Sequence, residues 1–252
     1  MSMSSVTLLN LHKDPLARVV HHSIKDEVAE RFATLIASGV LNVGDAMPGE
    51  RDLASTMGVS RETIRGALLI LSTKGIVSVV QGARTKVVSA DIGQLGMSAM
   101  SNGRVTDYAL EDVHEGRLMV EAQIAVLAVE RIDVPTINQL KKLVEVQETT
   151  IVHPVSFLIA DRAFHNILYQ SCGNAVLSDL AANLYSYQLN HRRSAISKTG
   201  AIEQSIADHS LILRALVARD ADALIKAFGV HERRIYSSTL ALLGIPDNEK
   251  NA

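Results

Sequence analysis

Apolar side chains recur at helical spacing near the start of the chain. Between about residues 21 and 38 they are four residues apart, at Ile24, Val28, Phe32 and Ile36. Because residues four apart lie on one face of a helix, this spacing predicts an amphipathic helix.

Two shorter helices follow, joined by a tight turn. The segment Glu50–Met57 comes after Pro48, and Gly58 lies where a left-handed C-cap is expected. Ser60 is then placed to cap a third helix, Arg61–Thr73. Helix, glycine-containing turn and helix in this order predict a helix-turn-helix motif.

A small hairpin comes next. Ile76–Val80 and Thr85–Val88 are β-rich and are separated by a turn with Gly82 and Arg84 at its tip. A hairpin in this place is a wing, a loop whose exposed backbone can approach the minor groove or the phosphates. The Ser- and Gly-rich stretch Ser89–Arg104 predicts a linker.

Beyond residue 105 the pattern is helical throughout. Breakers divide it into about six helices, at Pro135, Pro154, Cys172–Asn174, Thr199–Gly200 and Arg219–Asp220. We therefore predict a mainly α protein with two domains. A winged helix-turn-helix domain spans residues 1–88 with its core at about 21–88, a linker spans 89–105, and an all-helical bundle spans 106–252.

Composition and charge limit the classes of protein to which this chain can belong. The 252 residues are 47% hydrophobic, which excludes a mainly disordered chain. No uncharged apolar run reaches about 18 residues, so no membrane span is expected. No secretory signal is visible, and the single cysteine, Cys172, fits a reduced, cytoplasmic setting. The net charge of -2 argues at first against a nucleic-acid binder, but the first 90 residues are mildly basic and the rest acidic.

Polar residues near the beginning of the third helix suggest DNA contacts. Arg61, Thr63 and Arg65 lie where a recognition helix meets base edges and phosphates, and Arg51 lies on the helix before it. The alternative is a small αβ domain whose arginines are merely solvated. The order of helix-turn-helix and wing favours DNA binding.

Histidines at core-facing positions suggest a metal site. Asp161 and His165 are four apart on one expected helix, while His209 and His231 lie on apolar stripes of two later helices. A carboxylate and three imidazoles in an apolar core are costly unless they are paired or bind a metal. Such ligands suit Zn²⁺, Ni²⁺ or a similar divalent ion rather than Ca²⁺. The alternative is a set of hydrogen-bonded core histidines.

The helix-turn-helix region resembles a known family. From Pro48 to Arg65 the sequence PGERDLASTMGVSRETIR matches the P-x-E-R-x-L-A…G-V-S-R-x-T-[IV]-R pattern of GntR-family transcription regulators. At the wing tip the chain has Gly-Ala-Arg-Thr, where many members have Gly-x-Gly-Thr. The resemblance assigns Arg51, Ser60, Arg61, Thr63, Arg65 and Gly82 to DNA, and the place of Arg84 at the tip of the hairpin adds this residue to the candidates.

Residues 110–240 resemble the helical effector domain of the FadR-type subfamily, called the FCD domain. The shared features are Arg117-Leu118-x-x-Glu121, Asp161-x-x-x-His165, Gly173-Asn174, Asp208-His209 and His231. The resemblance implies that Asp161, His165, His209 and His231 hold one divalent ion per chain, zinc or a similar metal such as nickel or manganese. About six helices favour the VanR-like group, whereas a short helix within residues 91–100 would favour the seven-helix FadR-like group.

The resemblance also implies an effector site beside the metal for a small carboxylate. Arg117 offers a bidentate fork for such a ligand, and the alternative is an intrahelical ion pair with Glu121. The remaining effector-site candidates are Glu121, Asn174, Tyr187, Asn190 and Arg193.

From these features we expect a cytoplasmic, homodimeric transcription regulator rather than an enzyme. Two winged helices would read a palindromic operator, and a small carboxylate effector would release the repressor from it. Two alternatives stay open: a regulator that senses the metal itself, and a metal-dependent hydrolytic enzyme with Glu121 as its general base.

Overall fold

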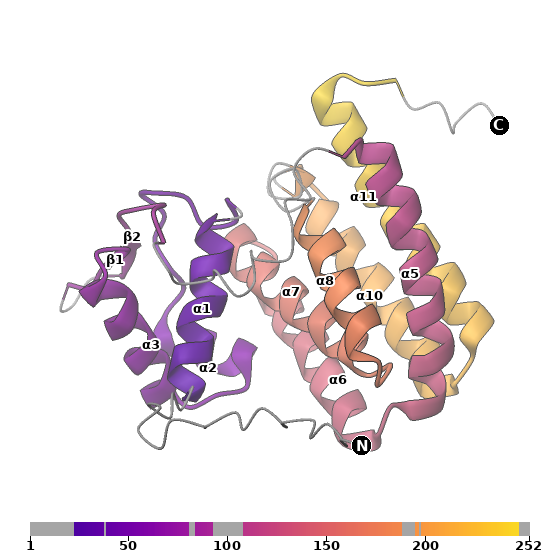
Figure 1. The fold of residues 1–252 in the computed structure, drawn as a ribbon, viewed down its shortest axis with the longest axis horizontal. Coiled ribbons are helices and arrows are strands. Elements are labelled where there is room, and N and C mark those ends of the chain that lie inside the picture. Colours follow the sequence, from indigo (N-terminus) through magenta and orange to yellow (C-terminus); the bar gives the residue numbers. More distant parts are fainter. Residues whose placement is uncertain are drawn as a thin grey trace, which may run out of the picture.

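The computed structural model describes residues 23–37, 39–80, 84–92, 108–187, 195–196 and 198–246. Figure 1 shows two parts side by side: three helices with a hairpin, and a larger group of helices. We call α1–α3 with the hairpin the head, and α5–α11 the body. The mainly helical architecture, with a helix-turn-helix head and an all-helical body, confirms the predicted fold class.

The head contains three helices at the predicted places: α1 (Ile24–Ala37), α2 (Glu50–Met57) and α3 (Arg61–Thr73). The apolar stripe of α1 is buried at Val28, Phe32 and Ile36, and α1 packs against α3. Ile24, the first member of the predicted stripe, is 62% exposed. It lies in the first turn, where the helix has not yet reached the core.

The turn between α2 and α3 has the predicted caps. Gly58 is left-handed with φ of 65° and donates its N–H to the carbonyl of Ala54. Ser60 is extended, and its Oγ accepts the N–H of Thr63 at 3.0 Å. These two caps fix the angle at which α3 leaves α2.

The hairpin is shorter than predicted. Strands β1 (Val77–Ser78) and β2 (Lys86–Val87) pair antiparallel, with Val77 opposite Val87. Val79 and Val80 are both about half exposed, because two consecutive apolar residues point to opposite faces and neither face is covered there. The wing residue Gly82 lies outside the described residues.

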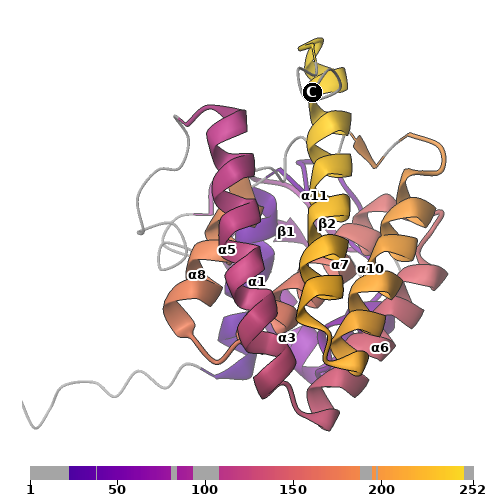
Figure 2. The ribbon, with the colours of Figure 1, turned by 90° about the vertical axis from the view of Figure 1, so that its right-hand side faces the viewer.

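Six described helices make up the body. They are α5 (Leu110–Arg131), α6 (Val134–Thr149), α7 (Pro154–Gln170), α8 (Ala175–Tyr187), α10 (Ala201–Ala218) and α11 (Ala221–Leu243). Figure 2 shows α5, α10 and α11 running alongside each other on the side of the body away from the head. Residues 93–107 lie outside the described part, so the choice of a VanR-like group stays a prediction.

Helix boundaries in the body follow the predicted breakers. Asp133 caps α6 by accepting the N–H of Thr136 at 2.8 Å, and Asp220 caps α11 in the same way. Arg219 between α10 and α11 has a left-handed φ of 54°. Its guanidinium donates to the carbonyls of Val129 and Ile132 at 2.5 and 2.8 Å. The α10–α11 turn is thereby attached to the end of α5.

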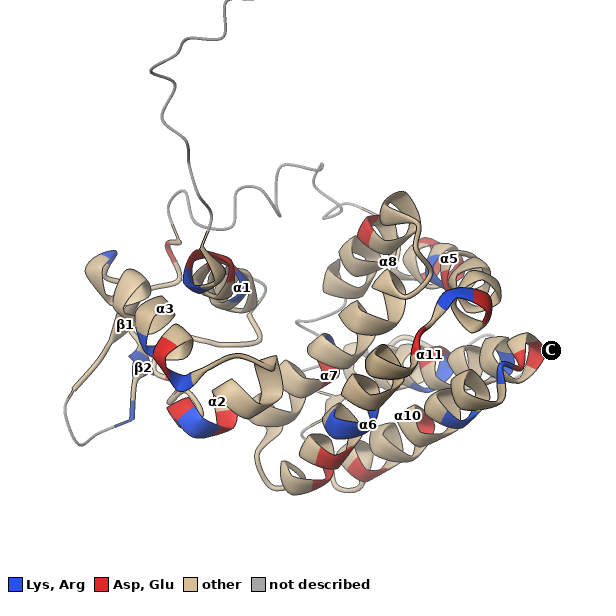
Figure 3. Ribbon diagram, turned by 90° about the horizontal axis from the view of Figure 1, so that it is seen from below, with Lys and Arg blue, Asp and Glu red and all other residues tan. Residues whose placement is uncertain are grey.

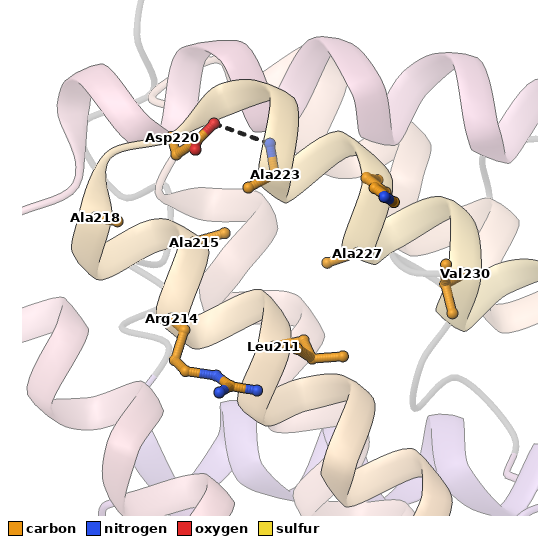
Figure 4. A pocket seen from close by; sticks show the side chains of 9 residues that line it. Leu211, Arg214, Ala215, Ala218, Asp220, Ala223, Ala227 and Val230 are labelled. Carbon is orange, nitrogen blue, oxygen red and sulfur yellow. Dashed lines mark hydrogen bonds between the residues drawn. The ribbon is translucent and has the colours of Figure 1, made fainter.

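Small side chains open a groove between α10 and α11. Its volume is about 410 Å³, and alanines line much of it, with Arg214 and Lys226 among the few polar residues (Figure 4). The core-facing His209 and His231 are not among its lining residues, although they lie on the same two helices. This groove is therefore separate from the histidine cluster of the body.

None of the helices in the described ranges is long and apolar enough to cross a membrane.

Candidate DNA-binding surface and metal centre

The amino-terminal end of α3 is exposed to solvent. Arg61 is exposed there, and Thr63, whose Oγ1 lies 2.9 Å from Ser60 Oγ, is partly exposed. Ile64, Ala67 and Leu68 occupy the opposite, buried stripe. One face of α3 thus holds the core while the other is free to enter a groove of DNA.

Arg65 is engaged by a neighbouring carboxylate. Its Nη2 lies 3.0 Å from Glu50 Oε2, and its side chain is 61% exposed. The hydrogen bond and the negative charge of Glu50 raise the pKa of Arg65. A DNA phosphate would have to compete with Glu50 for this guanidinium. Figure 3 shows that α2, the helix that carries Glu50, has both positively and negatively charged residues.

Two predicted DNA contacts face the body in this arrangement. Arg51, whose side chain is 87% exposed, lines a pocket of about 350 Å³ together with Thr150 and His153. Exposed Arg84 lines a second pocket of about 220 Å³ together with Pro154. The segment between α6 and α7 thus stands across from both arginines.

The four predicted metal ligands come together in the body. Asp161 and His165 lie on α7, His209 on α10 and His231 on α11. Each offers one ligand atom, and these atoms lie within 4.8 Å of one another. All four side chains are buried, at most 1% exposed. Three helices that are far apart in sequence therefore converge on one point of the core.

The geometry inside this cluster is compact. Asp161 Oδ1 lies 3.3 Å from His209 Nε2 and 3.8 Å from His165 Nε2. The ring centroids of His209 and His231 are 4.8 Å apart. Atoms at these separations can meet a single divalent ion after small rotations, since Zn–N bonds are about 2.0–2.1 Å long.

Outer partners orient several of these ligands. Gln147 Oε1 accepts the Nδ1–H of His209 at 2.7 Å, which leaves Nε2 to face Asp161. Asp208 Oδ2 lies 3.4 Å from His231 Nδ1, and the Tyr185 hydroxyl donates to Asp161. A hydrogen bond to one imidazole nitrogen fixes the other as a metal ligand, so the residues present fit a metal of the zinc type.

Asp208 also contacts a cation at the edge of the cluster. Its Oδ2 accepts from Arg234 Nε at 3.1 Å. Burial raises the pKa of the Asp208 carboxyl, and the charge of Arg234 acts against this. A small cavity of about 70 Å³ reaches Asp208 and His231 at this edge. Among the described residues of the body, this cavity is lined by His231, which is a member of the cluster.

Arg117 lies in a buried network of charges. Its Nε is 2.9 Å from Glu121 and its Nη1 is 2.9 Å from Glu232, with all three side chains fully buried. Its Nη2 donates to the hydroxyl of Tyr169, which in turn donates to Glu121. Burial alone would lower the pKa of Arg117, but Glu121 and Glu232 more than offset this and raise it well above its usual value.

This network lies next to the cluster of Asp161 and three histidines, with the ring of Tyr185 between them. The guanidinium of Arg117 lies 5.0 Å from the ring centroid of Tyr185, which contacts Asp161 through its hydroxyl. The sequence-based alternative for Arg117, an ion pair with Glu121, is present in the structure. Its role as a carboxylate clamp stays a prediction.

The other effector candidates occupy several places. Asn174 caps α8, where its Oδ1 accepts the N–H groups of Val176 and Leu177. The Tyr187 hydroxyl donates to the carbonyl of Tyr108, at the start of the body. Asn190 and Arg193 lie outside the described residues.

Sequence reasoning missed two residues of this region. Gln147 lies on α6, and nothing in a single amide within an amphipathic helix indicates a contact with a histidine 62 residues away. Glu232 follows His231 directly, so the helical period places it off the histidine stripe. The buried salt bridge to Arg117 depends on the packing of α5 against α11.

Two protein families match the chain, one over the head and one over the body. The family "Bacterial regulatory proteins, gntR family" matches residues 24–87. The FCD domain family matches residues 112–234. The chain belongs to the GntR family of regulators, with an FCD domain as its body. This family consists of transcription regulators, which decides against the metal-dependent enzyme.

Named relatives of this GntR-family chain are regulators as well. The transcriptional repressor NanR of Cronobacter sakazakii is 26% identical, over 92% of this chain and 90% of its own. The Uxu operon regulator of Haemophilus influenzae is 25% identical, over 84% and 80%. Among solved structures, Escherichia coli McbR/YncC covers 88% of this chain and 97% of its own, at 20% identity and a TM-score of 0.49.

Proposed function

We propose that this GntR-family regulator is a repressor that a small carboxylate effector releases from its operator. The observation that carries the proposal is the pairing of two features. One is the exposed face of α3 with Arg61 at its beginning, and the other is the buried Asp161 and histidine cluster of the body. The first can read DNA, and the second can hold the group that receives the effector.

The DNA-binding role rests on placement rather than on a broad basic field. Arg61 and Arg51 are exposed, while Arg65 shares its charge with Glu50. A few contacts of this kind gain strength when two copies bind one palindrome, because the symmetry of the dimer matches that of the operator. We therefore propose a homodimer that acts in the cytoplasm, where its operator DNA is found.

The metal role rests on the ligand set and its outer partners. Asp161, His165, His209 and His231 would hold one divalent ion, and the ion would supply open positions for an effector carboxylate. Gln147 and Asp208 orient two of the imidazoles. For Arg117 to clamp the effector, it would have to exchange Glu121 or Glu232 for the new carboxylate, because both already bind it.

A mobility-shift assay with the DNA upstream of the gene tests the regulator. We expect the Arg61→Ala variant to bind this DNA about 10- to 100-fold more weakly than wild type. The matched control is Arg214→Ala, which removes an exposed arginine of the body and leaves binding unchanged. Equal binding by wild type and Arg61→Ala would remove α3 from the DNA interface.

The same assay separates effector release from metal sensing. With the metal-loaded protein, release of the DNA by small organic acids supports a carboxylate effector. Release by added Zn²⁺ alone, in the absence of any organic acid, would favour the alternative in which the ion is the signal.

A further inference from the structure

A cleft of about 510 Å³ lies between the head and the body. Helices α1 and α2 form one wall, and α6 and α7 form the other. Its size is in the range of small-molecule sites. The polar lining residues used below are Arg31 of α1, Ser55 of α2, Lys142 of α6, and Arg162, Asn166 and Gln170 of α7.

One stripe of α7 faces this cleft. Arg162, Asn166 and Gln170 are four residues apart, so they lie on the same side of the helix. Asp161 directly precedes Arg162 in the sequence, and His165 directly precedes Asn166. Both belong to the buried cluster and point into the body core. Helix α7 therefore separates the metal cluster from the cleft and presents different polar groups to each.

One nitrogen of the Arg162 guanidinium lacks a partner in this cleft. Its Nη1 is buried and has no hydrogen-bond partner among the described residues. Burial lowers the pKa of Arg162, and the positive charge of Arg31 lowers it further, against the opposing effect of Tyr185. A buried donor without a partner is costly, so Nη1 of this guanidinium is suited to bind an anion.

The charged residues that line the cleft are Arg31, Lys142 and Arg162 against Glu27 and Glu30, so cations are in excess. Arg31 on the opposite wall bonds Glu27 at 2.6 Å along its own helix, and Lys142 is exposed on α6. Asn166 and Ser55 supply further hydrogen-bond donors from the two walls. The cationic and amide groups thus come from both the head and the body.

We propose that this cleft binds a small organic oxyanion, with Arg162 as its principal partner and Arg31 contributing from the head. The shared chemistry of the ligand is a carboxylate or phosphate group that accepts hydrogen bonds from a guanidinium. Because both walls contribute, the bound anion stabilises the observed placement of the head on the body. This site is separate from the metal centre of the proposed function.

Thermal unfolding of the full chain tests the site with two probes, inorganic phosphate and succinate. Each is compared with chloride at equal ionic strength. At a concentration about a hundredfold above its Kd, a bound probe raises the Tm of wild type by about 5 °C or more. The probe that acts identifies the ligand as a phosphate or a carboxylate. A wild-type Tm that responds to neither probe overturns the proposal.

Variants locate the response. Arg162→Gln abolishes the probe-dependent shift, and its Tm without probe is no lower than that of wild type, because the buried Nη1 has no hydrogen bond to lose. The matched control is Lys141→Gln, which lies beside Lys142 but does not line the cleft, and it keeps the full shift. A shift that persists in Arg162→Gln overturns the site.

Arg31→Gln decides the question if Arg162→Gln does not fold. Arg31 is on the surface of the head, on a different domain from the metal cluster. Loss of at least half of the shift in this variant supports the cleft. An unchanged shift assigns the anion to another place, such as the metal centre, and overturns the proposal.

Discussion

The head and the body place their arginines in opposite surroundings. Arg51 and Arg61 of the head are exposed to solvent, whereas Arg117 of the body is fully buried between Glu121 and Glu232. An exposed charge costs little to keep and is available to a large anionic partner such as DNA. A buried charge must be compensated within the protein, so its neighbours determine both its stability and its function.

The same contrast applies to how each part is assembled. The residues that we propose as DNA contacts on α2 and α3 come from fewer than twenty consecutive positions, held by the caps at Gly58 and Ser60. The cluster of Asp161 and three histidines draws on α7, α10 and α11, and its outer partners add α6 and α8. A local motif survives many changes elsewhere, while a cluster from several helices depends on how the whole body packs.

The largest expected effect comes from removing the charge at the centre of the body. Arg117→Met leaves Glu121 and Glu232 buried without their cation, and we expect the free energy of unfolding to fall by about 3–5 kcal/mol. Urea unfolding measures the loss. Arg214→Met on the exposed side of α10 is the control and should change stability by less than about 0.5 kcal/mol. A loss below about 1 kcal/mol for Arg117→Met would show that the network is not the stabilising element we describe.

The second-largest effect is expected at Gln147, which bonds Nδ1 of His209 and not the Nε2 atom that faces Asp161. Gln147→Leu removes the acceptor that holds His209 Nδ1, and we expect metal affinity to drop about 10- to 100-fold. Competition with a chromogenic chelator measures the affinity. Gln147→Glu keeps an acceptor oxygen and should retain most of it, and Gln123→Leu, exposed on α5, should have no effect. Equal affinities for Gln147→Leu and wild type would exclude the orienting role.

A smaller effect is expected in the head. Ser60→Ala removes the side-chain cap of α3, at a cost of about 1 kcal/mol in stability. Ser60→Asn supplies another capping oxygen and should restore most of the loss. Chemical unfolding of the three proteins gives the comparison. If Ser60→Asn were as unstable as Ser60→Ala, the loss would have to come from something other than the cap.

The smallest effect tests the competition for Arg65. Glu50→Gln frees this guanidinium and removes a negative charge near the DNA, so operator binding should strengthen a few-fold, by less than about tenfold. Fluorescence anisotropy at fixed salt measures the change. Glu203→Gln on the exposed side of α10 controls for the loss of one negative charge. Weaker operator binding by Glu50→Gln would mean that Glu50 positions Arg65 rather than withholding it.

Much of the fold could be read from the sequence because its signals are local. The helix-turn-helix was predicted from Gly58 and Ser60, which cap the two helices on either side of the turn, and Pro154 and Asp220 marked helix boundaries in the body. The hairpin was predicted too long because a run of valines does not tell which of them lack a covering partner. Val79 and Val80 are such residues.

The metal cluster could be predicted in part for the same reason. Asp161 and His165 share a helical face, which the spacing of four residues shows directly. The contacts of Gln147 and Glu232 arise only when α6 meets α10 and α11 meets α5, and no local pattern carries that information. The unpartnered Nη1 of Arg162 and the cleft that it lines likewise become visible only when the head is placed against the body.

We propose that the buried cluster of Asp161 and three histidines in the body is a metal centre. Elemental analysis of the purified protein tests this most directly, alongside the His165→Ala, His209→Ala double variant. We predict about one divalent transition-metal ion per chain in wild type and a loss of that ion in the double variant, with the fold checked by circular dichroism. Equal metal content in the two proteins, or no bound metal in wild type after reconstitution with Zn²⁺, would contradict the claim.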